Sequence, residues 1–120
     1  MYAGSCLCGR VKYAINGPVK RTSHCHCRMC QKQHGAAFGS YANVASADFA
    51  YIEGAAEVAV YASSPGVQRC FCKICGSNLT WQMEAYKDRI AVTLGTFDTP
   101  YESVVHQELN EDTRASWLAE

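Results

Sequence analysis

The sequence predicts a small, mainly β protein, and three observations carry this prediction. The chain has 120 residues, of which 48% are hydrophobic and 18% charged, as in a single globular domain. Turn signals interrupt it often, at Asn16–Pro18, Ser63–Gly66, Cys75–Gly76 and Thr99–Pro100. Between these turns, apolar and polar residues alternate with the period of a strand. We therefore expect one domain that covers residues 1–120.

Six runs are typical of strands because they are rich in β-branched and aromatic residues. They are RVKYAI (10–15), ADFAYIEG (47–54), EVAVYA (57–62), SNLTWQ (77–82), RIAVTLG (89–95) and SVVHQEL (103–109). In the first run, Val11, Tyr13 and Ile15 share one face. By the same criterion we expect about eight to ten strands in all.

Helical pattern is scarce in this chain. The segment Arg28–Gln33 can form one turn. The C-terminal run EDTRASWLAE (111–120) can form another, with Asp112 or Thr113 as its cap. The class is therefore mainly β, with at most two short helices.

The eight cysteines predict metal sites. They form three groups, which are Cys6/Cys8, Cys25/Cys27/Cys30 and Cys70/Cys72/Cys75. In a C-x-C pair on a strand both side chains point to one face, so both sulfurs can bind one ion. A C-x-x-C pair does the same from a tight turn. Zinc takes four such ligands tetrahedrally, and structural zinc sites use protein ligands alone.

The cellular location decides between metal and disulfides. The N-terminal MYAGSCLCG lacks the features of a signal peptide, and no apolar run is long enough to span a membrane. We therefore expect a cytoplasmic protein, in which thiols stay reduced and disulfides are disfavoured. Iron–sulfur clusters also use four thiolates, but the C-x-C and C-x-x-C pairs suit zinc better.

The spacing suggests how the cysteines divide. Cys72 and Cys75 form a knuckle that needs two more ligands, and Cys6 with Cys8 offers two. Joining the start of the chain to this knuckle closes a long loop, where a metal stabilises most. A second site then remains in the middle segment. Its members are Cys25, Cys27 and Cys30.

The second site has two possible forms. Three protein ligands with one exchangeable position are the pattern of catalytic zinc. Cys70 could instead supply a fourth thiolate and close the site. We expect two zinc ions per chain in either form.

Charge excludes two classes of partner. The formal net charge is zero, so no overall field attracts nucleic acid or a membrane surface. Basic residues are nonetheless concentrated in residues 1–35, which hold no acidic residue. This asymmetry indicates two solvated faces, or a basic segment that neutralises metal thiolates and meets an anionic substrate.

Three motifs in order resemble one known family. GSCLCGRVKY (4–13), SHCHCRMCQK (23–32) and FCKICGSNL (71–79) are similar to the motifs of the GFA family. This family includes glutathione-dependent formaldehyde-activating enzymes and the centromere protein V domain. The similarity extends to GTFD (95–98) and to His106 and Trp117, so it covers nearly the whole chain.

The resemblance implies a fold, two zinc sites and an activity. The fold is a β-tent-like arrangement of antiparallel sheets stapled by zinc. The structural zinc ligands are Cys6, Cys8, Cys72 and Cys75, and the ligands of the second zinc are Cys25, Cys27 and Cys30. The implied activity joins formaldehyde and glutathione into S-hydroxymethylglutathione, a carbon–sulfur lyase reaction.

We expect the chemistry at the second zinc, but the sequence identifies no catalytic side chain there. A glutathione thiol could take the open metal position and lose its proton. His24, His26 or His34 could transfer that proton, although His26 alternates with the ligands and should face away from them. Arg10, Arg28 and Lys32 are candidates to bind substrate carboxylates.

Two other functions compete with the enzyme. The chain could be a zinc-stabilised binding domain without catalysis, or a zinc-thiolate protein for redox or metal buffering. Cys70 discriminates between them, because a fourth thiolate on the second zinc would leave no position for substrate. The sequence does not reveal the oligomeric state.

Overall fold

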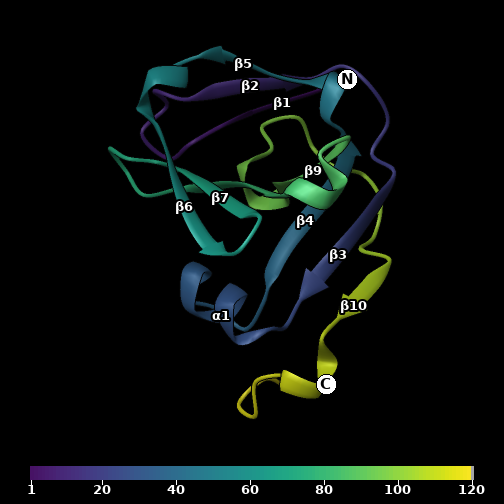
Figure 1. The fold of residues 1–120 in the computed structure, drawn as a ribbon. Helices are drawn as coiled ribbons and strands as arrows, with labels where there is room; N and C mark the ends of the chain where they lie inside the picture. The colour runs from purple at the N-terminus through teal and green to yellow at the C-terminus, as the bar shows by residue number, and fades with distance from the viewer. Residues whose placement is uncertain (120) are drawn as a thin grey trace.

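The computed structural model describes residues 1–119, and it is mainly β (Figure 1). Its strands are β1 (Tyr2–Ser5), β2 (Lys12–Ile15), β3 (Arg21–Cys25), β4 (Gly39–Ala45), β5 (Phe49–Glu53), β6 (Val58–Ser64), β7 (Val67–Cys72), β8 (Asn78–Met83), β9 (Arg89–Thr93) and β10 (Gln107–Leu109). The α-helix is α1 (Arg28–His34). The short 3-10 turns are Ser46–Asp48, Ala55–Glu57, Glu84–Tyr86, Leu94–Thr96 and Glu111–Thr113. Each of the six runs named from the sequence contains a strand, whereas β1, β3, β4 and β7 lie outside those runs.

The strands form two sheets. The small sheet has the order β1-β2-β5, and the large sheet has the order β10-β3-β4-β9-β8-β7-β6. All pairs are antiparallel except β10 with β3, which is parallel. The resemblance implied antiparallel sheets alone, so β10 is an exception to that expectation. It arises because the chain returns from β9 through a long irregular segment to the far edge of the large sheet.

The core lies between the two sheets. Val11, Tyr13 and Ile15 of the small sheet are at most 1% exposed, as their alternation predicts. They pack against residues of the large sheet such as Val44 and Val92. The other face of the large sheet is therefore free to carry a functional site.

Helix α1 begins directly after the second cysteine group. The Cys27 sulfur accepts a hydrogen bond from the Cys30 N–H at the N-cap, in place of the usual hydroxyl or carboxylate. Gly35 ends the helix with φ of +58°, and its N–H donates to the Gln31 carbonyl. The predicted turn at Arg28–Gln33 is confirmed.

The C-terminal run forms one short turn, as the sequence predicts, but the predicted cap is wrong. The 3-10 turn Glu111–Thr113 follows Asn110, and neither Asp112 nor Thr113 is its cap. The Thr113 carbonyl and hydroxyl instead hydrogen bond with Gln31 and the His26 carbonyl. These contacts bind the segment to α1 and to the loop between β3 and α1. Glu120 lies outside the described residues.

The C-terminal segment and α1 lie at the same end of the large sheet (Figure 1). Both are far from the small sheet in this view. Across residues 1–119, no helix is long and apolar enough to cross a membrane.

Candidate metal centre

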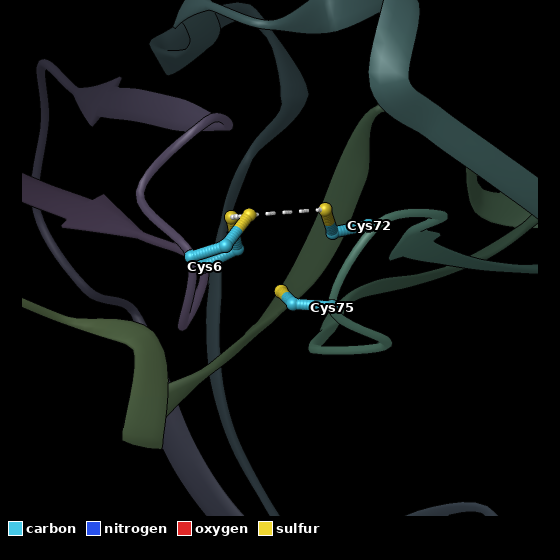
Figure 2. Close-up of side chains that lie close together, drawn as sticks. Cys6, Cys72 and Cys75 are labelled. Atoms are coloured by element: carbon cyan, nitrogen blue, oxygen red, sulfur yellow. Dashed lines mark hydrogen bonds between the residues drawn. The ribbon is translucent and has the colours of Figure 1, made fainter.

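The first cysteine cluster joins two loops that are distant in the chain. Its members are Cys6, Cys8, Cys72 and Cys75, whose sulfurs all lie within 4.8 Å of one another (Figure 2). The Cys6 and Cys8 sulfurs are 3.6 Å apart, and those of Cys8 and Cys72 are 3.9 Å apart. A tetrahedral zinc with Zn–S bonds near 2.3 Å sets its sulfurs about 3.8 Å apart. The cluster could therefore bind a metal ion with this geometry.

Two similar turns present these sulfurs. The Gly9 N–H donates to the Cys6 carbonyl, and the Gly76 N–H donates to the Cys72 carbonyl. Both glycines have φ of +81°, a left-handed conformation that a side chain would disfavour. The Val11 N–H also donates to the Cys6 sulfur at 3.3 Å. The local backbone is thus folded to hold sulfurs, because its turns expose N–H groups toward them.

The first cluster is anchored in the core. Cys6 is 4% exposed and Cys72 is fully buried, and both belong to the packed cluster between the sheets. Ser77 Oγ lies 3.2 Å from Cys75 Sγ, and this hydrogen bond lowers the pKa of Cys75 to about 5. A thiolate is the form that a metal requires. The burial of Cys6 and Cys72 gives this cluster a structural position.

The second cluster comes from one local segment. Cys25 is the last residue of β3, Cys27 is the N-cap of α1 and Cys30 lies in its first turn. Their sulfurs lie within 4.8 Å of one another and could bind a metal ion. Both clusters thus match the division that the spacing predicts.

Each sulfur of the second cluster accepts a hydrogen bond. Asn110 Nδ2 donates to Cys25 at 3.2 Å, and the Cys30 N–H donates to Cys27 at 3.4 Å. Arg69 Nη1 donates to Cys30 at 3.5 Å, and the Tyr41 hydroxyl lies 3.7 Å from the same sulfur. Such donors stabilise negative sulfur and orient it, so they favour three thiolates on one metal.

The contact between Cys25 and Cys30 shifts the pKa values of the two thiols in opposite directions. The Cys30 side chain hydrogen bonds with Cys25 and lowers the pKa of Cys25 to about 5. The same contact, together with burial, raises the pKa of Cys30 well above its usual range. The Arg69 guanidinium opposes this rise. A metal ion binds these cysteines in their thiolate form, which the Arg69 guanidinium favours at Cys30.

Cys70 lies on the opposite face of the large sheet. Consecutive strand residues point to opposite faces, and Arg69 points toward Cys30. Cys70 instead pairs across the sheet with Thr80, which pairs with the buried core residue Val92. The placement of Cys70 therefore does not support its role as a fourth ligand of the second site.

A pocket of about 240 Å³ opens at the second cluster. Its floor is a row of cross-strand neighbours on the large sheet. From β4 to β7 the row contains Asn43, Ala91, Trp81 and Arg69. All three sulfurs line this pocket, together with Tyr41 and Asn110. The second cluster is thus open to a small molecule on one side.

The three basic residues expected to bind substrate carboxylates lie in different parts of the structure. Lys32 lines a cavity that shares Arg69 with the cysteine pocket. Arg28 is exposed and donates to Gln31 on its own helix. Arg10 is exposed beside the turn of the first cluster, away from the pocket. Of these three residues, only Lys32 lines a cavity that adjoins the pocket of the second site.

The three histidines considered for proton transfer also differ in their surroundings. His24 Nδ1 and His26 Nε2 lie 2.9 and 2.6 Å from the two carboxylate oxygens of Glu108. His26 is buried and faces away from the cluster, as its position between Cys25 and Cys27 predicts. His34 Nε2 lies 2.9 Å from the Tyr41 hydroxyl. Only His34 is thus connected to the cysteine pocket, through Tyr41.

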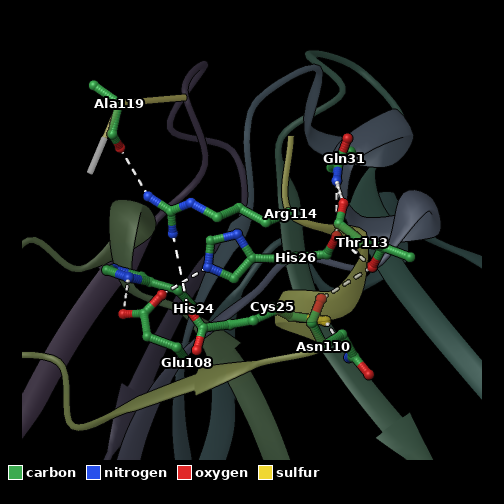
Figure 3. A network of polar contacts seen from close by, with 10 residues as sticks. His24, Cys25, His26, Gln31, Glu108, Asn110, Thr113, Arg114 and Ala119 are labelled. Carbon is green, nitrogen blue, oxygen red and sulfur yellow. Dashed lines mark hydrogen bonds and ion pairs between the residues drawn. The ribbon is translucent and has the colours of Figure 1, made fainter. Parts of the chain in front are cut away.

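The C-terminal segment is hydrogen bonded to the part of the chain around Cys25 (Figure 3). Glu108 bridges His24 and His26, and the His26 N–H donates to the Leu109 carbonyl. Asn110 then adopts φ of +59°, which directs its amide toward Cys25. The parallel pairing of β10 with β3 therefore supplies a wall of the pocket.

Sequence reasoning missed the residues around the second cluster. They are Tyr41, Arg69, Trp81 and Asn110. The parallel pairing that brings Asn110 to Cys25 has no local sequence pattern. Arg69 directly precedes Cys70, the first cysteine of the second C-x-C-x-x-C motif. Because neighbouring strand residues point to opposite faces of a sheet, this position is the one sequence signal that could have indicated the sheet face on which Arg69 lies.

Comparisons with known proteins identify the family of this chain. A family model described as glutathione-dependent formaldehyde-activating enzyme (GFA) matches residues 1–118. Curated proteins of Aspergillus flavus and Aspergillus oryzae are each 28% identical over 110 residues, which cover 88% of this chain and 51% of theirs. Their names include the words glutathione-dependent formaldehyde-activating enzyme. The chain spans about half the length of these relatives.

A solved structure shows that the fold is shared. The crystal structure of a Rhodobacter sphaeroides protein matches with a TM-score of 0.73 and 18% identity, over 88% of this chain and 98% of that one. At this identity the match concerns the fold alone. The family model spans both cysteine clusters and nearly the whole chain, and the chain therefore belongs to the GFA family.

Proposed function

We propose that this protein is a zinc-dependent enzyme of the carbon–sulfur lyase type that combines formaldehyde with glutathione. One observation carries the proposal. The sulfurs of Cys25, Cys27 and Cys30 gather on the wall of a pocket, and no fourth sulfur joins them within residues 1–119. Three ligands with an accessible position are the pattern of catalytic zinc.

We assign the two metal ions different roles. The ion held by Cys6, Cys8, Cys72 and Cys75 is structural, because its site has four ligands and is rooted in the core. The ion held by the second cluster supplies a Lewis acid that favours the thiolate form of a substrate thiol. We take residues 1–120 as one domain that carries both sites.

The reaction itself is a simple addition. The thiol sulfur attacks the carbon of formaldehyde and forms a C–S bond, while the electrons of the C=O bond move to oxygen. That oxygen takes up one proton, which balances the proton lost by the thiol. The reverse reaction breaks the same C–S bond and releases formaldehyde.

The chain offers one route for the proton. The Tyr41 hydroxyl lines the pocket and contacts His34 Nε2 at 2.9 Å. Asn78 Nδ2 lies 3.5 Å from His34 Nδ1 and orients the ring. We assign Tyr41 the role of a donor to the developing alkoxide, with His34 behind it.

The activity is tested with the zinc-loaded protein. NMR exchange spectroscopy on a mixture of formaldehyde and glutathione should show faster interconversion with S-hydroxymethylglutathione when the protein is added. Protein from which the metal has been removed should give the uncatalysed rate. An unchanged rate with fully loaded protein would contradict the proposal.

The metal content is a separate prediction. Protein purified under reducing conditions should contain two zinc ions per chain, one for each cysteine cluster. Inductively coupled plasma mass spectrometry against the protein concentration measures this ratio. One ion per chain, or iron in place of zinc, would contradict the assignment.

A zinc-stabilised binding domain without catalysis is the second candidate. The observation in its favour is that none of the described residues lining the cysteine pocket is an aspartate, a glutamate or a histidine. A pocket without such a base relies on the metal and on Tyr41 for proton transfer. The exchange measurement above distinguishes the two candidates.

The proposal also has consequences for the cellular location and the partner of the protein. Two thiolate clusters need reduced cysteines, so we expect a reducing compartment such as the cytoplasm. The partner is a small thiol, which fits a pocket of about 240 Å³.

A further inference from the structure

Three cavities adjoin one another along one face of the large sheet. The cysteine pocket, of about 240 Å³, shares Arg69 with a cavity of about 410 Å³ beside α1. In the other direction it shares Asn43, Trp81, Ala91 and Leu109 with a further cavity of about 240 Å³. The second cysteine cluster therefore lies midway along a continuous groove.

The groove contains a buried cation, Arg69, that contacts the Cys30 sulfur but pairs with no carboxylate among residues 1–119. Arg69 is 4% exposed, and its Nε donates to Ser63 Oγ at 2.9 Å. Its Nη1 donates to Gln33 Oε1 at 2.7 Å and to Cys30 Sγ. Its Nη2 makes no hydrogen bond, and no carboxylate pairs with the guanidinium, among residues 1–119.

This arrangement is built to receive an anion. Burial of a charge is costly unless the charge is paired, and Arg69 pairs only with the Cys30 sulfur and with the neutral oxygens of Ser63 and Gln33, which leaves its Nη2 group free. Lys32 lines the same cavity and also lacks a carboxylate partner within the described chain. A guanidinium with a free amino group binds a carboxylate well, because its fork of donors matches the two oxygens.

The opposite end of the groove has a second pair of cations. Arg21 and Arg89 both line the further cavity. The Arg89 guanidinium carbon lies 4.4 Å from the centre of the Tyr86 ring, which holds this side chain in place. Neither arginine pairs with a carboxylate in the part of the chain that the structure describes.

The charge of the groove differs from that of the whole chain. The formal net charge of the protein is zero. The described lining of all three cavities contains no aspartate or glutamate, but it contains four cationic side chains. These are Arg21, Lys32, Arg69 and Arg89. The groove is thus positive at both ends, with the thiolates of the metal site between them.

We propose that the groove has two anion subsites, Arg69 with Lys32 at one end and Arg21 with Arg89 at the other, and that they select a small peptide thiol with a carboxylate on each side of its sulfur. This inference rests on the proposed function, since it places the substrate sulfur at the second cluster. Glutathione has this distribution of charge.

The test compares glutathione with its diethyl ester, in which both carboxylates are neutral. Binding to the zinc-loaded protein is measured by isothermal titration calorimetry. The variants are Lys32→Gln at one end and Arg21→Gln with Arg89→Gln at the other. Lys32 is changed in preference to Arg69, because Arg69 contacts Cys30 and its loss would disturb the metal site. Lys12→Gln, an exposed cation on the small sheet, is the matched control.

We expect each set of changes at the ends to weaken glutathione binding about tenfold, because each removes a charge-assisted contact with a carboxylate. The diethyl ester should bind unchanged protein more weakly than glutathione does, and the variants should not weaken it further. Lys12→Gln should leave both affinities as they are. Circular dichroism and zinc content confirm that each variant is folded and loaded.

The outcomes separate the two proposals. If glutathione and its diethyl ester bind equally well while formaldehyde exchange is accelerated, the anion subsites are refuted and the proposed enzyme stands. If the variants lose affinity for glutathione alone but no acceleration is seen, the subsites stand and the proposed enzyme fails. If glutathione does not bind the loaded protein, both are refuted.

Discussion

Replacing Cys72 by serine is expected to unfold the protein. Cys72 is fully buried in the core between the sheets, and its sulfur belongs to the first cluster. A structural zinc site contributes on the order of 10 kcal/mol to folding. The total stability of a domain is only about 5–15 kcal/mol. Loss of one thiolate therefore removes most of the free energy of unfolding.

The matched control for this experiment is Cys70→Ser. Cys70 lies on the same strand, is half-buried and belongs to neither cluster, so its replacement should cost about 1 kcal/mol. Far-UV circular dichroism and thermal melting at equal zinc concentration compare the two variants. A folded Cys72→Ser protein that melts within a few degrees of Cys70→Ser would contradict the structural role.

The sequence was sufficient to predict the elements that depend on local pattern. Val11, Tyr13 and Ile15 alternate strictly, and their burial follows from that alternation. Short strands without this contrast were harder to recognise. Strand β4, Gly39–Ala45, has Gly, Ser, Ala and Asn among its residues, so its sequence resembles a loop.

The C-terminal segment shows where local reasoning fails. The polar run beginning at Glu111 has good helix formers, but Thr113 uses its carbonyl and hydroxyl to bind Gln31 and His26. Tertiary hydrogen bonds thus replace those of a helix. The parallel pairing of β10 with β3 also depends on tertiary contacts, because Glu108 of β10 is held by His24 and His26 from a distant segment of the chain.

The candidate site was predictable only in its cysteines. The fixed spacing of the C-x-C and C-x-x-C motifs indicates which sulfurs can lie close together, and both cysteine clusters form with that grouping. The residues that hydrogen bond to the sulfurs come from other strands. Arg69, Tyr41 and Asn110 reach Cys30 or Cys25 through sheet register, which is a property of the whole fold. Of the three cations named from the sequence, only Lys32 lines the groove.

Replacing Cys30 by serine is expected to abolish activity while the fold survives. Cys30 contributes one of the three sulfurs of the second cluster, and two thiolates no longer hold zinc in competition with solvent. The Cys25–Cys30 segment closes a far shorter loop than the link from Cys6 to Cys75. The difference in loop-closure entropy alone is about 2 kcal/mol. Loss of the second metal therefore destabilises the protein much less than loss of the first.

The contacts of Cys30 also support the prediction that the fold survives loss of the second metal. Its sulfur contacts Arg69 and Tyr41 at the pocket, on the face of the large sheet opposite the main core. Serine is smaller and keeps a hydrogen-bonding atom at this position, so Arg69 and Tyr41 retain a partner. We expect a change in the free energy of unfolding of about 1–3 kcal/mol.

Three measurements together decide the division of roles. Zinc content should fall from two ions per chain to one, the formaldehyde exchange rate should return to the uncatalysed value, and the circular dichroism spectrum should stay that of the unchanged protein. Cys70→Ser keeps both clusters, and it should retain both zinc ions and full activity. If Cys30→Ser unfolds as Cys72→Ser does, the second cluster is structural as well. If it keeps its activity with one zinc ion, the reaction does not take place at the second cluster.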